Sequence, residues 1–233
     1  MLEARNLQVF YGRAQILYDV SLSAARGEVV VLLGRNGAGK STTLKALIGL
    51  VSPKSGEVEF QGKRLDGLEP YQIARRGLGY VAEDRRIFAE LSVLENLEVG
   101  RRPPREGLPA WTHQRIFLLF PQLEEAKNRP GGRLSGGEQQ MLTIARTLMG
   151  NPSCILLDEP SEGLAPIVLD QMSGVIRDLK AQGLSVLVSE QNLHFAVQVA
   201  DRAYIIEKGR IRFSGMIAEL DRNEEIRAAY LAV

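Results

Sequence analysis

The sequence predicts an α/β fold in which a mostly parallel sheet forms the core and a helical region is inserted into it. Three observations support this prediction. Continuously apolar segments rich in β-branched residues recur along the chain, a pattern typical of strands that are covered on both faces. Segments with the apolar spacing of helices lie between them. From about residue 87 to 150, helical segments follow one another with no strand between them, which indicates an insertion.

The first part of the chain predicts strands followed by one helix. The expected strands are residues 3–11, 17–24 and 28–33. The last of them, EVVVLL, is continuously apolar, as expected for a strand buried in a parallel sheet. A helix is expected at 42–50, because Leu44, Leu47 and Ile48 share one helical face. Residues 56–62 alternate like an exposed strand.

The middle of the chain predicts helices and the last third returns to strands. The expected helices are residues 91–100, 113–123 and 137–149, with a loop at 101–111. The later expected strands are 153–158, 184–189 and 203–207, with a helix at 165–182 and an amphipathic helix at 216–233. We therefore expect a single domain over 1–233, in which 1–86 and 151–233 form the core and about 87–150 form a helical subdomain.

The composition excludes some functional classes. The 233 residues carry a formal net charge of +1, which predicts no general attraction to nucleic acid or to anionic lipid. The longest apolar run, residues 29–33, is far too short to span a membrane, and the N-terminus lacks the pattern of an export signal. One cysteine, Cys154, excludes an internal disulfide and fits a reducing compartment. We expect a cytoplasmic protein that is still able to dock on a membrane protein.

A phosphate-binding loop is predicted between the third strand and the first helix. Residues 34–41, GRNGAGKS, match the pattern G-x-x-x-x-G-K-[ST] in full, in the strand–loop–helix context that the pattern requires. The loop N–H groups would converge on phosphate at a helix N-terminus. Lys40 would hold the β- and γ-phosphates, and the Ser41 hydroxyl would bind Mg²⁺. A glycine-rich turn that matches by chance is the alternative, and the flanking elements oppose it. The predicted nucleotide contacts are Asn36, Gly37, Ala38, Gly39, Lys40, Ser41 and Thr42.

Two carboxylates are predicted beside that loop. In CILLDEP, residues 154–160, Asp158 and Glu159 stand at the carboxyl end of a buried strand, where open α/β sheets bind ligands. Asp158 is expected to hold Mg²⁺, directly or through water, and Glu159 to orient or deprotonate the attacking water. A purely structural role is unfavourable, because carboxylates at a buried strand end are costly without a cation.

A second glycine-rich loop lacks the side chains that bind phosphate and Mg²⁺ in the first loop. In RLSGGEQQM, residues 133–141, two glycines open a helix, which presents N–H groups to an anion. The segment has no lysine and no hydroxyl–aspartate pair. With these motifs, essentially the whole chain resembles the ATP-binding cassette (ABC) ATPases, the motor subunits of ABC transporters. The most specific part of the resemblance is LSGGE, residues 134–138, which is similar to the family signature LSGGQ.

The resemblance implies a fold and a dimeric site. It implies the P-loop NTPase fold of ABC ATPases, with an N-terminal antiparallel β subdomain and an inserted helical subdomain. In the family, two cassettes pair head to tail, and the signature loop of one closes on the γ-phosphate held by the other. Ser135, Gly136 and Gly137 are therefore expected to contact a partner's ATP. Tyr11 stands where the family stacks an aromatic ring on adenine, and a core tyrosine is the alternative.

Three positions depart from the family pattern. Glu83 replaces the usual glutamine, which keeps an oxygen ligand for Mg²⁺ but loses the amide donor. In the family this loop contacts the membrane subunit, so residues 83–86 are expected to do so, with a solvated charge run as the alternative. Gln191 replaces the switch histidine, and His194 is not expected to substitute for it. Ala165 replaces an aspartate used across the dimer interface.

Together these departures define a branch of the family. AEDRRIF, SEQN and EGLAP resemble the LivF-like ATPases of branched-chain amino-acid uptake, and urea and amide uptake ATPases share parts of the pattern. The resemblance implies ATP and Mg²⁺, two membrane-spanning permease subunits, a second and different ABC ATPase, and indirectly an extracytoplasmic solute-binding protein. It places the chain peripherally at the cytoplasmic face of the membrane.

Two further functional questions follow from the motifs. Gln191 and Ala165 predict that this chain's own phosphate loop forms the slower of two unequal sites. A soluble single-cassette scaffold, as in iron–sulfur cluster assembly, is the alternative function. A P-loop kinase or GTPase is opposed by the signature loop.

Overall fold

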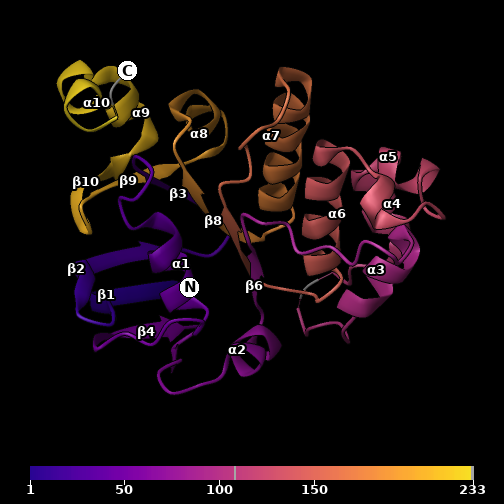
Figure 1. The fold of residues 1–233 in the computed structure, drawn as a ribbon, viewed down its shortest axis with the longest axis horizontal. Coiled ribbons are helices and arrows are strands. Elements are labelled where there is room, and N and C mark those ends of the chain that lie inside the picture. Colours follow the sequence, from indigo (N-terminus) through magenta and orange to yellow (C-terminus); the bar gives the residue numbers. More distant parts are fainter. Residues whose placement is uncertain (108, 232–233) are drawn as a thin grey trace.

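The computed structural model describes residues 1–107 and 109–231. Leu108, in the predicted loop, and Ala232 and Val233, at the end of the predicted C-terminal helix, lie outside the described residues. The described chain contains two sheets and the helices that cover them (Figure 1). It has the predicted α/β fold, with an antiparallel N-terminal sheet, a mostly parallel core sheet and an inserted helical region.

The smaller sheet is antiparallel and is built from the N-terminal part of the chain. Its strand order is β2-β1-β4-β5. The strands are β1 (Leu2–Tyr11), β2 (Ala14–Ala24), β4 (Ser55–Phe60) and β5 (Lys63–Arg64). β1 pairs with β2 on one side and with β4 on the other. The sheet therefore joins strands that precede the phosphate loop to a strand that follows α1.

The larger sheet has the strand order β10-β9-β3-β8-β7-β6. Its strands are β3 (Val29–Leu33), β6 (Leu78–Val81), β7 (Cys154–Asp158), β8 (Ser185–Glu190), β9 (Arg202–Glu207) and β10 (Arg210–Met216). All neighbours are parallel except β9 and β10. Every residue of β3, β7 and β8 is buried, which explains the apolar sequence of β3, of residues 154–157 in β7 and of residues 186–188 in β8. The carboxyl ends of β3, β7 and β8 therefore meet at one edge of the sheet.

The helices are distributed on both faces of the larger sheet and in the insertion. They are α1 (Lys40–Leu47), α2 (Pro70–Arg76), α3 (Val93–Gly100), α4 (His113–Leu119), α5 (Pro121–Glu125), α6 (Gly136–Leu148), α7 (Pro166–Ala181), α8 (Leu193–Val199), α9 (Ile217–Arg222) and α10 (Glu224–Tyr230), with a short 3₁₀ helix η1 (Gly131–Arg133). In Figure 1, α3 to α6 lie at one end of the molecule, and α9 and α10 lie at the other.

Two predicted helices are each split in two. The segment 113–123 forms α4 and α5, because Pro121 has no N–H to continue the first helix and instead begins the second. The tail forms α9 and α10, because the Asn223 side chain accepts a hydrogen bond from the Ile226 N–H and so starts a new helix. The sequence analysis also missed α2, which begins at Pro70 after a capping box formed by Glu69 and Gln72.

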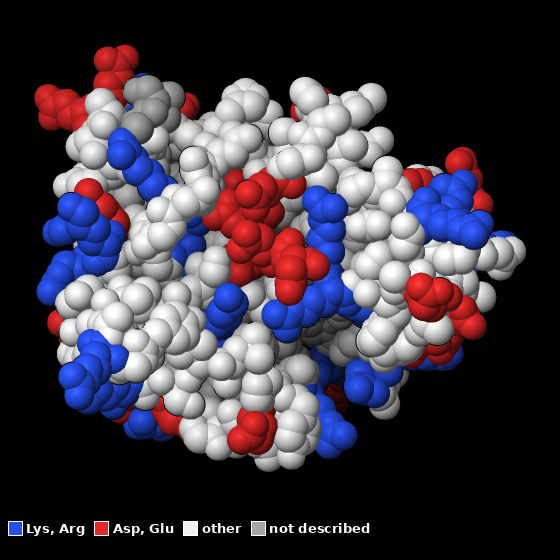
Figure 2. Space-filling model, viewed as in Figure 1, with Lys and Arg blue, Asp and Glu red and all other residues white. Residues whose placement is uncertain are grey.

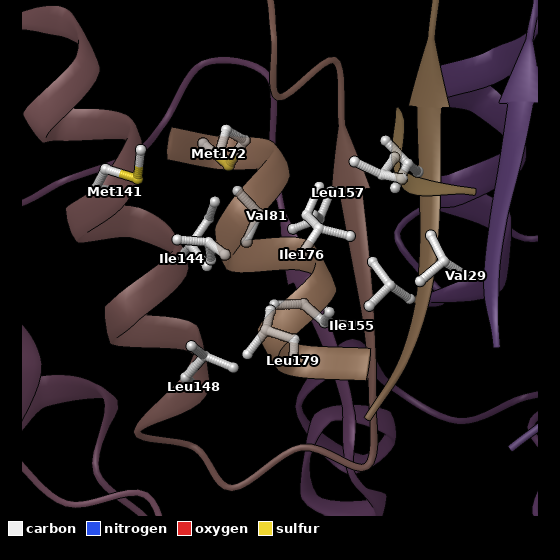
Figure 3. Close-up of a cluster of buried hydrophobic side chains, with 14 of the residues drawn as sticks. Val29, Val81, Met141, Ile144, Leu148, Ile155, Leu157, Met172, Ile176 and Leu179 are labelled. Atoms are coloured by element: carbon white, nitrogen blue, oxygen red, sulfur yellow. The ribbon is translucent and has the colours of Figure 1, made fainter. Parts of the chain in front are cut away.

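The apolar core is divided by the larger sheet. Alternate residues of β3 enter the two core clusters: Val29 and Val31 pack with the insertion and α7, whereas Val30 and Leu32 pack with α1 and the smaller sheet. Figure 3 shows the first cluster, in which side chains of α6, α7 and β7 meet. Each fully buried aliphatic side chain contributes about 2 kcal/mol to folding. This packing fixes the N-terminus of α6 relative to the carboxyl end of β7.

Candidate ATP site and comparison with known proteins

The predicted phosphate loop connects β3 to α1. Its glycines are required for different structural reasons. Gly37 and Gly39 have φ angles of 77° and 112°, which favour glycine. Gly34 is required for close packing, since a Cβ there would lie 2.5 Å from the Ile206 carbonyl oxygen. Ala38 is buried beneath the loop, and its carbonyl accepts a hydrogen bond from the Gly209 N–H. The loop is therefore fixed on one side by its contacts with Ile206 and Gly209.

Lys40 joins this loop to the end of β7. Its Nζ donates to the Gly34 carbonyl at 2.6 Å and to the Arg35 carbonyl at 3.1 Å. The same Nζ forms an ion pair with Glu159 Oε1 at 2.8 Å, and only 4% of the lysine side chain is exposed. Burial raises the pKa of the Glu159 carboxyl, and the ion pair with Lys40 acts in the opposite direction. The Lys40 ammonium thus contacts both the phosphate loop and the Glu159 carboxylate.

Asp158 is held by three hydroxyl groups. Its Oδ1 accepts hydrogen bonds from Ser41 Oγ at 3.0 Å and Ser189 Oγ at 2.6 Å, and its Oδ2 accepts one from the Tyr80 hydroxyl at 2.9 Å. Burial and the charge of Asp158 raise the pKa of Tyr80, so its hydroxyl stays protonated and donates. Ser41 and Asp158, predicted as a magnesium-binding pair, are in contact.

Sequence reasoning missed Tyr80 and Ser189. They reach Asp158 because β6 and β8 flank β7 on its two sides, with Ser189 directly opposite Asp158. No motif gives either residue this role, although Ser189 is the first residue of SEQN. The signal was a hydroxyl residue near the end of each neighbouring strand, and using it requires the strand order.

A cavity of about 380 Å³ lies above the phosphate loop. Its lining takes in these predicted residues: Tyr11, Asn36, Gly37, Gly39, Lys40, Ser41, Thr42, Glu83 and Glu159. Tyr11 is 48% exposed, which does not fit a core tyrosine and leaves its ring free to contact a ligand. Glu162 also lines the cavity and was not predicted. In Figure 2, acidic side chains gather in the middle of the view, between α1 and α6, with basic side chains beside them.

The signature loop lies elsewhere. Ser135 is the N-cap of α6: its hydroxyl accepts from the Glu138 N–H, and Glu138 Oε2 accepts from the Ser135 N–H at 2.7 Å. Among the described residues, the cavity lining does not include Ser135, Gly136 or Gly137. Ser135 and Gly136 are exposed, so the beginning of α6 is on the surface of this chain.

The residues that depart from the family pattern lie at different places in the structure. Gln191 is exposed, lies between β8 and α8, and is not among the described residues that line the cavity. His194, on α8, is exposed, and its Nε2 lies 3.0 Å from Gln198 Nε2, so it is directed to its own helix. Ala165 is the exposed N-cap of α7. Glu83 is exposed at the cavity rim.

Comparison with known families decides the identity. A family model described as "ABC transporter" matches residues 17–162, which include the phosphate loop, the signature loop, Asp158 and Glu159. The chain belongs to the ABC transporter family. This ABC ATPase therefore binds and hydrolyses ATP.

Two curated relatives align over almost the whole of this ABC ATPase. The high-affinity branched-chain amino acid transport ATP-binding protein BraG of Pseudomonas aeruginosa is 42% identical over 99% of both chains. The lipopolysaccharide export system ATP-binding protein LptB of Escherichia coli strain K12 is 36% identical, covering 99% of this chain and 96% of LptB.

Solved structures agree with the fold. A nucleotide-free ATP-binding cassette from an ABC transporter superposes with a TM-score of 0.86 at 26% identity, over 100% of this chain and 98% of that one. A dimeric cassette in a post-hydrolysis state, bound to ADP and Pi, superposes with a TM-score of 0.80 at 25% identity, over 93% of this chain and 99% of that one. Within residues 1–107 and 109–231, this ABC ATPase has no helix long and apolar enough to cross a membrane.

Proposed function

We propose that this ABC ATPase energises an importer of branched-chain amino acids or of related amino-acid, amide or urea solutes. The 42% identity to BraG over 99% of both chains carries the proposal. The three departures at Glu83, Ala165 and Gln191 support it, because they resemble the same branch of the family. We propose that the chain works peripherally at the cytoplasmic face of the membrane, with two permease subunits and, indirectly, an extracytoplasmic solute-binding protein.

ATP would bind in the cavity above the phosphate loop. Tyr11 would contact the base, and the N–H groups of the loop and of the first turn of α1 would hold the phosphates. Lys40 would exchange the Glu159 carboxylate, now at 2.8 Å, for phosphate oxygens. ATP binding would therefore free the Glu159 carboxylate from its ion pair with Lys40, so that it could act on the attacking water.

The residues beside the loop fit a magnesium ion. Ser41 and Asp158 offer two oxygens in contact with each other, and Glu83 offers a third at the cavity rim, which is the donor chemistry that Mg²⁺ prefers. A bound Mg²⁺ would neutralise charge on the phosphates. Tyr80 and Ser189 would keep Asp158 oriented through their hydrogen bonds.

Glu159 would take a proton from the attacking water. Burial raises the pKa of this carboxyl, which makes it a stronger proton acceptor. Gln191 would hydrogen-bond the γ-phosphate but cannot become charged. The signature loop of a second cassette would complete the site, and this chain's Ser135, Gly136 and Gly137 would complete the partner's. We propose that the partner is a different ABC ATPase.

A groove on this chain fits the permease contact. It has a volume of about 530 Å³ and combines exposed Tyr71, Phe88 and Val99 with the arginines Arg86 and Arg146. One guanidinium nitrogen of Arg146, Nη1, is buried and has no hydrogen-bond partner in the described part of the chain. The groove includes Arg86 of the loop that follows β6, so a segment seated there would contact the loop that carries Glu83.

Uptake of labelled solutes tests the proposed function. In cells that carry Glu159→Gln in place of the wild-type chain, we expect uptake of labelled leucine, isoleucine or valine to fall to background, because no hydrolysis resets the motor. If amino-acid, amide and urea uptake are all unchanged while lipopolysaccharide fails to reach the cell surface, the importer proposal is wrong and the LptB-like function is correct.

A further inference from the structure

Glu190 is a buried carboxylate within SEQN, residues 189–192, and no role has been given to it so far. It is the last residue of β8, and only 1% of it is exposed. No lysine or arginine forms an ion pair with it within residues 1–107 and 109–231. A buried carboxylate without a cation is costly, so its remaining interactions have to offset that cost.

Three backbone N–H groups supply those interactions, and they come from two loops. Glu190 Oε1 accepts a hydrogen bond from the Ser161 N–H at 3.1 Å, in the loop after β7. Glu190 Oε2 accepts hydrogen bonds from the N–H groups of Gln191 and Asn192, both at 3.1 Å, in the loop before α8. One side chain thus joins the loop after Glu159 to the end of β8.

The loop after β7 needs such support. Glu159 has a φ of 49°, in the left-handed region that non-glycine residues rarely occupy. Its N–H donates to the Ser189 carbonyl at 3.1 Å and to the Ser189 hydroxyl at 3.2 Å. Pro160 has no N–H, and the next donor, Ser161, goes to Glu190. The backbone N–H groups of Glu159 and Ser161 therefore donate to Ser189 and Glu190, the last two residues of β8.

We infer that Glu190 is a positioning residue that holds the segment 159–161, and with it the Glu159 carboxylate, in the conformation used for hydrolysis. The inference rests on the proposed role of Glu159 as the base. Glu190 is not among the described residues that line the cavity above the phosphate loop, whereas Glu159 is, so Glu190 would act on hydrolysis through Glu159. Its own backbone carbonyl, which accepts from the Gly34 N–H at 3.2 Å, would be unaffected by side-chain replacement.

Replacement by glutamine gives a sharp test. The amide of Glu190→Gln has one oxygen and one NH₂ group, so at least one of the two loops faces a donor instead of an acceptor. We expect kcat for ATP hydrolysis, measured in the reconstituted complex with its partner subunits, to fall at least about tenfold, since small displacements of a catalytic group can cost about a hundredfold. KM for ATP should stay within about twofold, because the phosphate loop is intact.

Ser185→Ala is the matched control. Ser185 lies at the other end of β8, is fully buried, donates to the Ala25 carbonyl at 2.9 Å and accepts from the Gly27 N–H at 2.9 Å. It is equally part of the strand's hydrogen bonding but far along the strand from Glu159. We expect its melting temperature to fall while kcat is retained. An equal loss of kcat in both variants would overturn the inference, because it would indicate a general effect of strand stability.

A double-mutant comparison separates this inference from the proposed role of Glu159. If Glu159→Gln retains hydrolysis, the proposed base is wrong. If Glu159→Gln abolishes hydrolysis but Glu190→Gln retains the wild-type kcat, the inference alone is wrong. We expect both single variants to lose activity and Glu190→Gln to add nothing to Glu159→Gln. Should Glu190→Gln not fold, Glu190→Asp carries the same test, because its shorter side chain keeps the charge but cannot span both loops.

Discussion

Glu159 and Gln191 stand in different surroundings, although the resemblance implies a role at the γ-phosphate for both. Glu159 lines the cavity and is paired with Lys40 at 2.8 Å. Gln191 is exposed on the loop before α8 and is absent from the lining among the described residues. Its side chain also remains neutral, so it cannot replace a charged histidine. This contrast supports the prediction that the chain's own site is the slower of two.

Paired substitutions at these two residues test the unequal-site prediction. In the assembled transporter, Gln191→Ala should lower ATP turnover by less than about tenfold, because a single neutral hydrogen bond is lost. Glu159→Gln should abolish hydrolysis at this site, because the base is lost. Turnover of both variants would be measured in the same reconstituted complex at saturating ATP. A drop of about a hundredfold or more for Gln191→Ala would refute the prediction.

Residue identities could be predicted where a local motif records them. The spacing of GRNGAGKS and the pair Asp158–Glu159 gave the residues that now share one cavity or one hydrogen-bond network. Tyr80 lies in none of these motifs, and SEQN, which includes Ser189 and Glu190, did not indicate what either residue does. They act through strands that are adjacent in the sheet but distant in the chain, and the sequence does not state which strands pair.

At the scale of elements, two helices begin with the same capping chemistry but have different neighbours. Ser92 and Glu95 form a capping box at α3, and Ser135 and Glu138 form one at α6. The boxes satisfy the same backbone donors and should stabilise their helices equally. Only the α6 box includes a residue of the signature loop, so only there should the cap also carry function.

Alanine at each N-cap separates these two effects. Ser92→Ala and Ser135→Ala should each lower the free energy of unfolding by about 1 kcal/mol, as loss of an N-cap usually does. Only Ser135→Ala should also weaken ATP-dependent association with a second cassette, by at least about tenfold. Chemical denaturation measures the first quantity, and ATP-dependent co-purification measures the second. Equal association of the two variants would contradict the predicted role of the signature loop.

Element types were easier to predict than element ends. The buried strands were found because β3 and the middle parts of β7 and β8 are continuously apolar, which directly reflects burial on both faces. The break at Pro121 was missed because the helical spacing continues across it, although proline cannot extend a helix. The helix α2 is short and has only Ile73 buried, so it leaves almost no apolar pattern in the sequence.

At the scale of the whole molecule, the two anion-binding loops face different tasks. The phosphate loop shares its cavity with Lys40 and Glu159, whereas the described signature loop does not line that cavity. The packing of α6 and α7 against the sheet fixes the second loop in place (Figure 3). This separation supports the proposal that each loop forms one half of a site and that a second cassette supplies the other half.

Recovery of partner proteins tests whether a second cassette completes the site. The tagged Glu159→Gln chain would be held closed with ATP and Mg²⁺, purified from solubilised native membranes, and its partners identified by mass spectrometry, with ATP omitted in a parallel sample. We expect two multi-span proteins and, dependent on ATP, a second and different ABC ATPase. Recovery of soluble partners alone would contradict it and would support a scaffold role such as that in iron–sulfur cluster assembly.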